Sequence, residues 1–368
     1  MRTAEPGAYA LPQAGPRAAS GGPLGQWYSS AGVRSGERRS FLRPRDGKVL
    51  FPARLVPHVG HPAVAALPQA RRELLVQLHL YQFLMATTHL ETRVVNVGAE
   101  RIANGRAGLD LSVSMRMDAF KVYCDEGYHA LYSLDLADQI ACATAVPVPA
   151  WDFGGFVDRL AFAGRALLPD QPVLAQLLQV VVFETLITAV LNEAPGEPDL
   201  DESVRTVLRD HARDEGRHHR FFSGFFHELW AGTDRALRPR VARLLPELVD
   251  VCLTADTVPA RAALLVAGLD EADADQVVRD CYGGAADPGR MAEIARGMVA
   301  MCRSAGVLDV PGAVDAFAEH HLLGVGEKAS GPDPATVSVS VLERGGGSAR
   351  GTTAAGVTTA SEPGGSEC

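Results

Sequence analysis

The chain has 368 residues, 47% of them hydrophobic, and a mean hydropathy of +0.03, which is typical of a globular protein with a sizeable core. Its formal net charge of −9 argues against a nucleic-acid partner, because phosphate binding needs a positive surface. The first twenty residues hold no apolar run of signal-peptide length and the six cysteines form no CxxC pair, so we expect a cytoplasmic protein rather than an exported, disulfide-rich one.

The two ends of the chain differ in composition from its middle. Residues 1–45 are rich in Gly, Pro, Ser and Arg and show little periodicity, and residues 329–368 are of low complexity. Such segments lack the apolar residues that a packed core requires. The sequence therefore predicts one domain over residues 46–328, between a disordered or loosely attached N-terminal segment and a disordered tail.

Apolar residues recur at spacings of three and four through the middle of the chain, and strand-like alternation is sparse. This pattern predicts an all-α fold, a ferritin-like helical bundle with additional helices. The four main helices are expected at 74–97, 117–140, 171–193 and 200–231, and shorter ones at 235–253, 258–267, 289–304 and 312–322.

The segment 171–193 is apolar on nearly every face and approaches the length of a membrane span. Two glutamines and the central Glu184 argue against lipid, where an ionised carboxylate is costly. We therefore expect a buried central helix of the bundle and no contact with a membrane. In such a setting Glu184 must be neutralised, bound to a metal or paired in an internal salt bridge, and the sequence leaves these options open.

Two pentapeptides stand out, DEGYH at 125–129 and DEGRH at 214–218, because they agree at four of five positions. A single Glu-x-x-His pair would carry little weight, since short motifs often arise by chance. The recurrence of Asp and Gly around both pairs makes coincidence a poor explanation. On a helix, Glu and His three residues apart lie on one face and can bind the same ion, as in the di-iron and di-manganese sites of helical bundles.

Such sites need one further Glu from each of two other helices, and hairpin geometry predicts which. Glu91 and Glu126 are equidistant from the turn signal at 104–108, as Glu184 and Glu215 are from a point beside the turn signal at 194–198. Glu100 is a rival for Glu91. Its midpoint with Glu126 falls in a stretch without helix breakers, so we expect Glu100 to be a solvated helix residue.

One histidine breaks the symmetry of the two half-sites. His211 precedes Glu215 by four residues and His218 by seven, so the three side chains fall within about 60 degrees on one helix face. A seventh ligand is therefore predicted at His211, for a total of three histidines and four glutamates.

Three further residues near the motifs are candidates for supporting roles. Asp125 and Asp214, each just before a predicted ligand, could accept a hydrogen bond from the non-ligating nitrogen of a histidine, although both could equally be exposed helix charges. His219 fits a supporting contact or bundle packing better than a ligand position. Outside the bundle, His58 and His61 are expected at the surface, in a loop flanked by prolines.

The ligand types indicate the class of metal. Carboxylate and imidazole without thiolate suit iron or manganese, whereas zinc takes fewer ligands. The sequence alone does not separate iron from manganese.

With these residues in place, the chain resembles the di-iron N-oxygenases of the p-aminobenzoate N-oxygenase type, which include the arylamine oxygenase of chloramphenicol biosynthesis. The resemblance covers roughly residues 50–320 and is sharpest at HLETRVVN (89–96), DEGYHALYSLDL (125–136), FETLIT (183–188) and HARDEGRHHRFF (211–222). It implies two iron ions held by four glutamates and three histidines. The matching residues are Glu91, Glu126, His129, Glu184, His211, Glu215 and His218.

The resemblance also implies an activity: a monooxygenase of antibiotic biosynthesis that uses O2 to oxidise an amine nitrogen to a hydroxylamine, nitroso or nitro group. The substrate would be a small-molecule amine, free or carrier-bound, and a ferredoxin or reductase would supply electrons. A homodimer is left open. Two alternatives remain at this point, a di-iron carbon hydroxylase or desaturase and a non-enzymatic, ferritin-like metal-binding protein.

Overall fold

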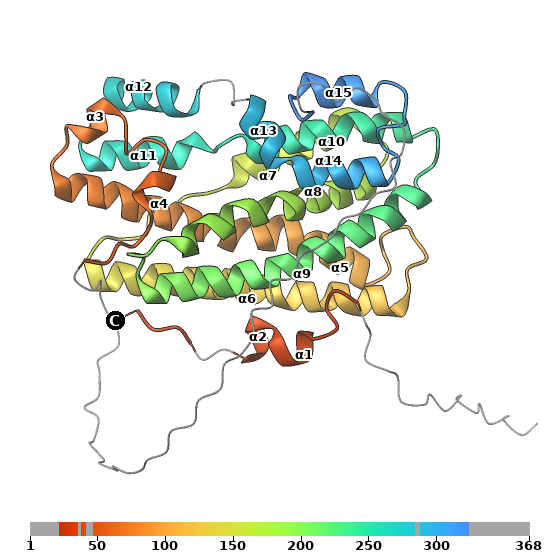
Figure 1. Cartoon of the computed structure of the whole chain (residues 1–368), viewed down its shortest axis with the longest axis horizontal. Helices are drawn as coiled ribbons and strands as arrows, with labels where there is room; N and C mark the ends of the chain where they lie inside the picture. Colours follow the sequence, from red (N-terminus) through yellow and green to blue (C-terminus); the bar gives the residue numbers. More distant parts are fainter. Residues whose placement is uncertain (1–21, 36–37, 42–46, 284–287, 324–368) are drawn as a thin grey trace, which may run out of the picture. The chain divides into compact units, whose positions relative to one another are not determined.

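A computed structural model describes residues 22–35, 38–41, 47–283 and 288–323. This part of the chain is all-α, as predicted, and the long helices of a bundle run in similar directions (Figure 1). Its residues form no strand beyond an isolated bridge between Val49 and Leu200. None of its helices combines the length and the apolar character needed to cross a bilayer.

The first predicted hairpin is formed by α4 (Gln69–Leu90), a π-helix (Glu91–Val95) and α5 (Asn96–Ala103), which pack along α6 (Val113–Thr144). The turn lies where the sequence placed it. Gly105 and Gly108 adopt left-handed φ angles of 70° and 75°, which glycine tolerates without strain. Ser112 then caps α6, because its side chain accepts a hydrogen bond from the Met115 amide.

The second predicted hairpin pairs α8 (Pro172–Glu193) with α9 (Glu202–Gly232). A short 3₁₀ helix, Ala194–Gly196, ends α8 at the expected turn. Asp201 begins α9 by accepting a hydrogen bond from the Ser203 amide at 2.9 Å. The two hairpins contact each other through α6 and α9 and through α8 and the π-helix.

Shorter helices surround the two hairpins, and two of those longer than four residues were not expected from the sequence. One is α7, whose sequence opens with two glycines, and the other is α12, which has few large apolar residues. The predicted helix at 289–304 is divided near Ala295. The remaining bounds are α1 Trp27–Ser30, α2 Gly32–Ser35, 3₁₀ Ala53–Leu55, α3 Pro62–Ala65, α7 Gly154–Leu167, α10 Arg238–Leu253, α11 Thr257–Ala267, α12 Glu271–Tyr282, α13 Pro288–Ile294, α14 Arg296–Ser304 and α15 Ala313–Glu319.

The described part of the N-terminal segment is not loosely attached, which corrects that expectation for these residues. Leu24 and Trp27 are buried, and Phe41 is buried with its amide bonded to the side chain of Gln139. A few large side chains suffice to anchor a segment that has no periodic pattern. Residues 1–21, 36–37 and 42–45 of this segment, and the predicted tail at 329–368, lie outside the described residues.

Two apolar clusters lie along the bundle. One includes Phe222, Phe225 and Phe226 of α9 with residues of α7, α8 and α10, and the other includes Tyr81 of α4 and Leu208 of α9 with residues of α6, α11 and α12. The middle of α9, which carries the DEGRH motif, lies between these two stretches. The polar residues at the centre of the bundle are therefore enclosed by apolar packing from both directions.

Candidate metal centre

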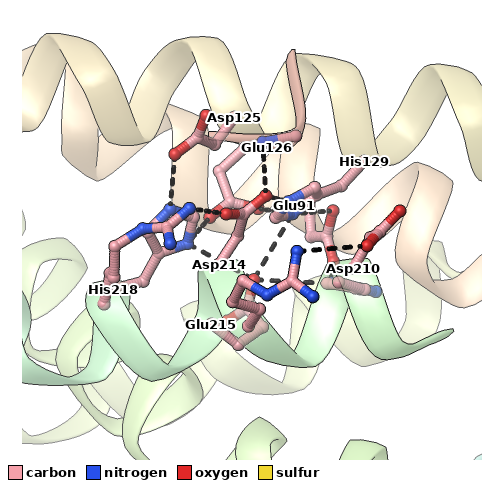
Figure 2. A network of polar contacts seen from close by, with 12 residues as sticks. Glu91, Asp125, Glu126, His129, Asp210, Asp214, Glu215 and His218 are labelled. Atoms are coloured by element: carbon pink, nitrogen blue, oxygen red, sulfur yellow. Dashed lines mark hydrogen bonds and ion pairs between the residues drawn. The ribbon is translucent and has the colours of Figure 1, made fainter. Parts of the chain in front are cut away.

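The structure brings all seven predicted ligand residues together inside the bundle. Glu91 opens the π-helix, Glu126 and His129 come from α6, Glu184 from α8, and His211, Glu215 and His218 from α9. Each is at most 1% exposed. Figure 2 shows the side chains of five of them turned toward one another: Glu91, Glu126, His129, Glu215 and His218. Four separate chain segments thus deliver seven ionisable side chains to one point.

One half of the cluster is centred on His211. Its Nε2 lies 2.9 Å from Oε1 of Glu91 and 3.3 Å from Oε1 of Glu215. The Nδ1 of His129 lies 3.6 Å from Oε2 of Glu91 and 3.4 Å from the same Glu215 oxygen. One atom from each of these four residues falls within 4.8 Å of the others, a grouping that could hold one metal ion.

The other half is centred on His218. Its Nδ1 lies 2.7 Å from Oε1 of Glu126, 3.3 Å from Oε1 of Glu215 and 4.0 Å from Oε2 of Glu184. Glu126, His129, Glu215 and His218 form a second four-residue grouping of the same size. Because His129 and Glu215 belong to both groupings, two metal positions would adjoin each other and share ligands.

The donor atoms fit two bound cations. Buried polar atoms are normally hydrogen-bonded, yet all eight carboxylate oxygens of the four glutamates make no hydrogen bond. The same holds for Nδ1 of His129, Nε2 of His211 and Nδ1 of His218, the nitrogens turned toward the carboxylates. Four carboxylates carry four negative charges, which two divalent cations would balance with the histidines neutral.

Without metal, burial and the neighbouring charges shift the pKa values of the clustered side chains. Burial, offset in part by His211, raises the pKa of Glu91 to about 7. Burial and the charges of Glu215 and Glu126 raise the pKa of Glu184 well above its ordinary value. Burial disfavours the charged form of His129, but the adjacent carboxylates of Glu126, Glu215 and Glu91 outweigh it and raise its pKa to about 10. The metal-free cluster must therefore hold protons where bound metal would supply the positive charge.

Asp125 and Asp214 support the histidines in a crossed arrangement. Asp125 of α6 lies 3.1 Å from Nε2 of His218 on α9, and Asp214 of α9 lies 3.4 Å from Nε2 of His129 on α6 (Figure 2). In a neutral imidazole, a proton on Nε2 leaves Nδ1 free to bind a metal. Each aspartate thus orients the histidine of the other motif.

The N-terminal segment supplies contacts that the sequence did not indicate. The indole Nε1 of Trp27 donates to both oxygens of Asp125, at 2.8 and 2.9 Å, and the Gly32 amide donates to Asp214 at 3.3 Å. Arg217 also forms an ion pair with Asp214. Trp27 and Gly32 lie in a stretch without periodicity, whereas the spacing of Asp214 and Arg217 on one helix could have predicted their contact.

The π-helix places Glu91. At its end the Asn96 amide donates to the Glu91 carbonyl five residues earlier, so the chain gains one residue relative to an α-helix. Single π-turns within α-helices are frequent at functional sites. A periodicity read at 3.6 residues per turn does not reveal this insertion.

Three other sequence candidates lie outside the cluster of seven. His219 is half-buried; burial lowers its pKa, and a hydrogen bond with the Glu184 backbone opposes that shift. Glu100 forms an ion pair with Arg106 near the surface, as its expected solvated position implies. The surface expectation is wrong for His58, which is 1% exposed and whose Nδ1 lies 2.7 Å from the Tyr282 hydroxyl.

A surface cavity of about 460 Å³ opens beside the cluster, between α6 and α9. Tyr132 lines it, and the Tyr132 ring centroid lies 5.4 Å from that of His129 and 6.0 Å from that of His211. One aromatic ring therefore contacts both the cavity and two of the predicted ligands.

Comparison with protein families gives a match over most of the chain. Residues 39–306 match the family described as p-aminobenzoate N-oxygenase AurF, and these residues include every member of the cluster. A comparison with curated proteins found no match.

Proposed function

The chain belongs to the family of p-aminobenzoate N-oxygenase AurF, and from this premise we propose that it is a di-iron oxygenase that oxidises the nitrogen of a small-molecule amine. The observation that carries the proposal is the set of eleven buried carboxylate and imidazole donor atoms that make no hydrogen bond. The first 45 residues and the tail would flank a catalytic domain over 46–328.

Two iron ions would be held by the seven clustered residues. One would take ligands from Glu91, His129, His211 and Glu215, and the other from Glu126, Glu184, Glu215 and His218. Iron held by carboxylate and imidazole ligands supplies the capacity to activate O2 and to accept and release electrons.

The protein's own residues prepare this chemistry in three ways. The four carboxylates set the charge of the centre, and Asp125 and Asp214 fix the orientation of His218 and His129. The apolar clusters on either side exclude water, which protects a reactive centre from side reactions.

Conversion of an amine to a hydroxylamine inserts one oxygen atom of O2 into an N–H bond and releases the other as water. The balance is RNH2 + O2 + 2 electrons + 2 protons giving RNHOH + H2O. The electrons would come from an external donor such as a ferredoxin or a reductase, and further turnovers would give nitroso and nitro products. The amine would be free or attached to a carrier, within an antibiotic pathway.

N-oxidation is preferred to carbon hydroxylation or desaturation for a specific reason. His211 stands 2.9 Å from Glu91 with its Nε2 free of hydrogen bonds, so it is available as a third histidine. The family match favours the same reaction.

The first experiment is a metal count on protein expressed with added iron, where we expect about two irons per chain. Metal-loaded protein, reduced chemically and exposed to O2 with p-aminobenzoate and other arylamines, should then yield N-oxidised products by mass spectrometry. One fully occupied zinc, or no bound metal, would exclude the di-iron proposal. Two irons with oxidation only at carbon would retain the cofactor and exclude the N-oxygenase.

A further inference from the structure

Exposed arginines gather on the face of the bundle that α6, α9 and the N-terminal segment share, where α2 contacts both long helices (Figure 1). We call this set the arginine face: Arg34, Arg38, Arg39, Arg209, Arg213 and Arg220. Three aspartates lie beside these arginines, Asp135, Asp138 and Asp210. Because the whole chain carries a net charge of −9, the arginine face is a positive area on a negative protein. Such an area attracts a partner of opposite charge.

Helix geometry places half of these arginines on the outer side of α9. Arg209, Arg213 and Arg220 fall within about 40 degrees of one another, on the side opposite to the predicted ligands. Arg209 and Arg220 lie about 16 Å apart along the helix, which exceeds the reach of a small anion and suits the surface of a protein. Glu202 shares this side, in the first turn of α9, and forms an ion pair with Arg205.

The N-terminal segment extends the arginine face across to α6. Arg38 donates to both oxygens of Asp135 on α6, at 2.6 and 3.0 Å, and Nη2 of Arg39 lies 2.7 Å from Oδ2 of Asp210 on α9. The arginine side chains are 71% and 42% exposed, whereas those of the two aspartates are 25% and 23% exposed. The positive groups are therefore outermost in both ion pairs.

The arginine face surrounds the surface cavity beside the metal centre. Arg38, Arg39 and Arg213 line this cavity together with Tyr128 and Tyr132. Among the described residues that line it, none is one of the seven predicted ligands. The ring of Tyr132 contacts both the cavity and two of the ligand histidines. A small molecule in the cavity would be held away from the metals by this ring, whereas an electron can cross it.

We propose that the arginine face is the docking surface of an acidic one-electron carrier protein of the iron–sulfur type. This inference rests on the proposed function, in which each oxidation of an amine to a hydroxylamine consumes two electrons and two protons. Two carriers would dock in succession. Each would lose one electron and leave in its oxidised form, and the protons would come from solvent. Electron transfer slows steeply with distance, so a carrier must approach the metals closely, and on this face the Tyr132 ring reaches from the cavity to the ligand histidines.

Binding of an acidic carrier tests the docking surface on the full-length, iron-loaded protein. Oxidised plant-type ferredoxin should bind in isothermal titration calorimetry, and its affinity should fall as salt is added, because salt screens exposed charges. The double variant Arg209→Glu/Arg213→Glu should raise the dissociation constant about tenfold, since attraction at two positions becomes repulsion.

The matched control is the double variant Arg72→Glu/Arg243→Glu, which makes the same change in net charge at exposed positions on α4 and α10. It should leave the dissociation constant of ferredoxin unchanged. Circular dichroism and iron content verify that both double variants fold. Equal affinities of the two double variants, or no binding of ferredoxin to the wild type, would overturn the proposal. A double variant at Arg209 and Arg213 that loses affinity for p-aminobenzoate instead of ferredoxin would assign the surface to the substrate and would also overturn it.

The route of the electron has a separate test. Tyr132→Leu removes the ring, so ferredoxin should bind as it does to the wild type, but the oxidation of reduced ferredoxin should slow in stopped-flow absorbance. Tyr132→Phe retains the ring and should restore the rate. Equal rates in all three proteins would overturn the assigned route.

A chemical reductant distinguishes failure of this inference from failure of the proposed function. Wild-type protein reduced with dithionite, without any carrier, should form N-oxidised arylamine in a single turnover. Product under these conditions without binding of ferredoxin would overturn the docking surface alone. Absence of product from the reduced, iron-loaded protein would overturn the proposed function, on which the inference rests.

Discussion

Glu184 tests the proposed metal centre most directly, because its substitution should have opposite effects on the metal-bound and the metal-free protein. With metal bound, its carboxylate would be a ligand, so Glu184→Gln should lower the iron content and the N-oxidation rate. Without metal, the same carboxylate is 1% exposed and makes no hydrogen bond. Its removal should therefore stabilise the metal-free fold.

The size of the stabilisation follows from proton linkage. Burial and the charges of Glu215 and Glu126 raise the pKa of Glu184 in the folded, metal-free protein, whereas the unfolded chain ionises near pH 4.3. While the folded state keeps the proton that the unfolded state has released, each pH unit removes about 1.4 kcal/mol of stability. Glutamine cannot ionise. While the folded state keeps this proton, the advantage of Glu184→Gln over the wild type should consequently grow by about 1.4 kcal/mol for each pH unit above pH 5.

The assay is urea unfolding of chelator-stripped protein at several pH values, followed by circular dichroism. Glu228→Gln, at an exposed position on the ligand-bearing helix α9, controls for the loss of a surface carboxylate and should show no such growth. A stability difference between Glu184→Gln and the wild type that does not change with pH would refute the assigned protonation. Wild-type iron content in Glu184→Gln would refute its assignment as a ligand.

The remaining predictions concern the residues around the metals. His211→Ala should retain iron, since six ligands suffice in related bundle sites, but should lose N-oxidation; unchanged product formation would make His211 a packing residue. Trp27→Phe keeps an aromatic ring in place and removes the hydrogen bond to Asp125, the residue that orients the predicted ligand His218. Because such supporting contacts strengthen metal binding, we expect iron to pass to a competing chelator about ten times faster. Tyr28→Phe is the control for that measurement, and equal release rates for the two variants would contradict a role for the indole.

Much of the architecture could be predicted because the long helices obey local rules. The all-α class followed from spacings of three and four, and the hairpin turns from Asn104–Gly108 and Ala194–Pro198, where glycine, asparagine and proline end helices for reasons confined to a few residues. α12 was not predicted, because Val277 and Val278 are its only branched aliphatic residues. Its N-terminus is capped by Asp270, whose side chain accepts a hydrogen bond from the Asp273 amide.

The seven clustered residues could be predicted for a similar reason. Each motif places its Glu and His on one face by helix geometry alone. The partner glutamate on the other helix of each hairpin follows from its equal distance in sequence from the turn. The contacts that hold the site together across the two hairpins could not be predicted from the sequence. The approach of Trp27 to Asp125 and the π-turn at Glu91 depend on contacts between segments far apart in the sequence, for which no local pattern exists.

α6 shows why periodicity alone could not assign the faces of a helix. One face carries Glu126 and His129, and a second holds the N-terminal segment through Lys121 and Asp125. The third face exposes large apolar side chains such as Leu131. Because apolar or buried residues occur on all three, the helix lacks the single polar side that usually marks solvent. The apolar pattern of α6 therefore predicts a helix but does not distinguish its metal-binding face from the other two.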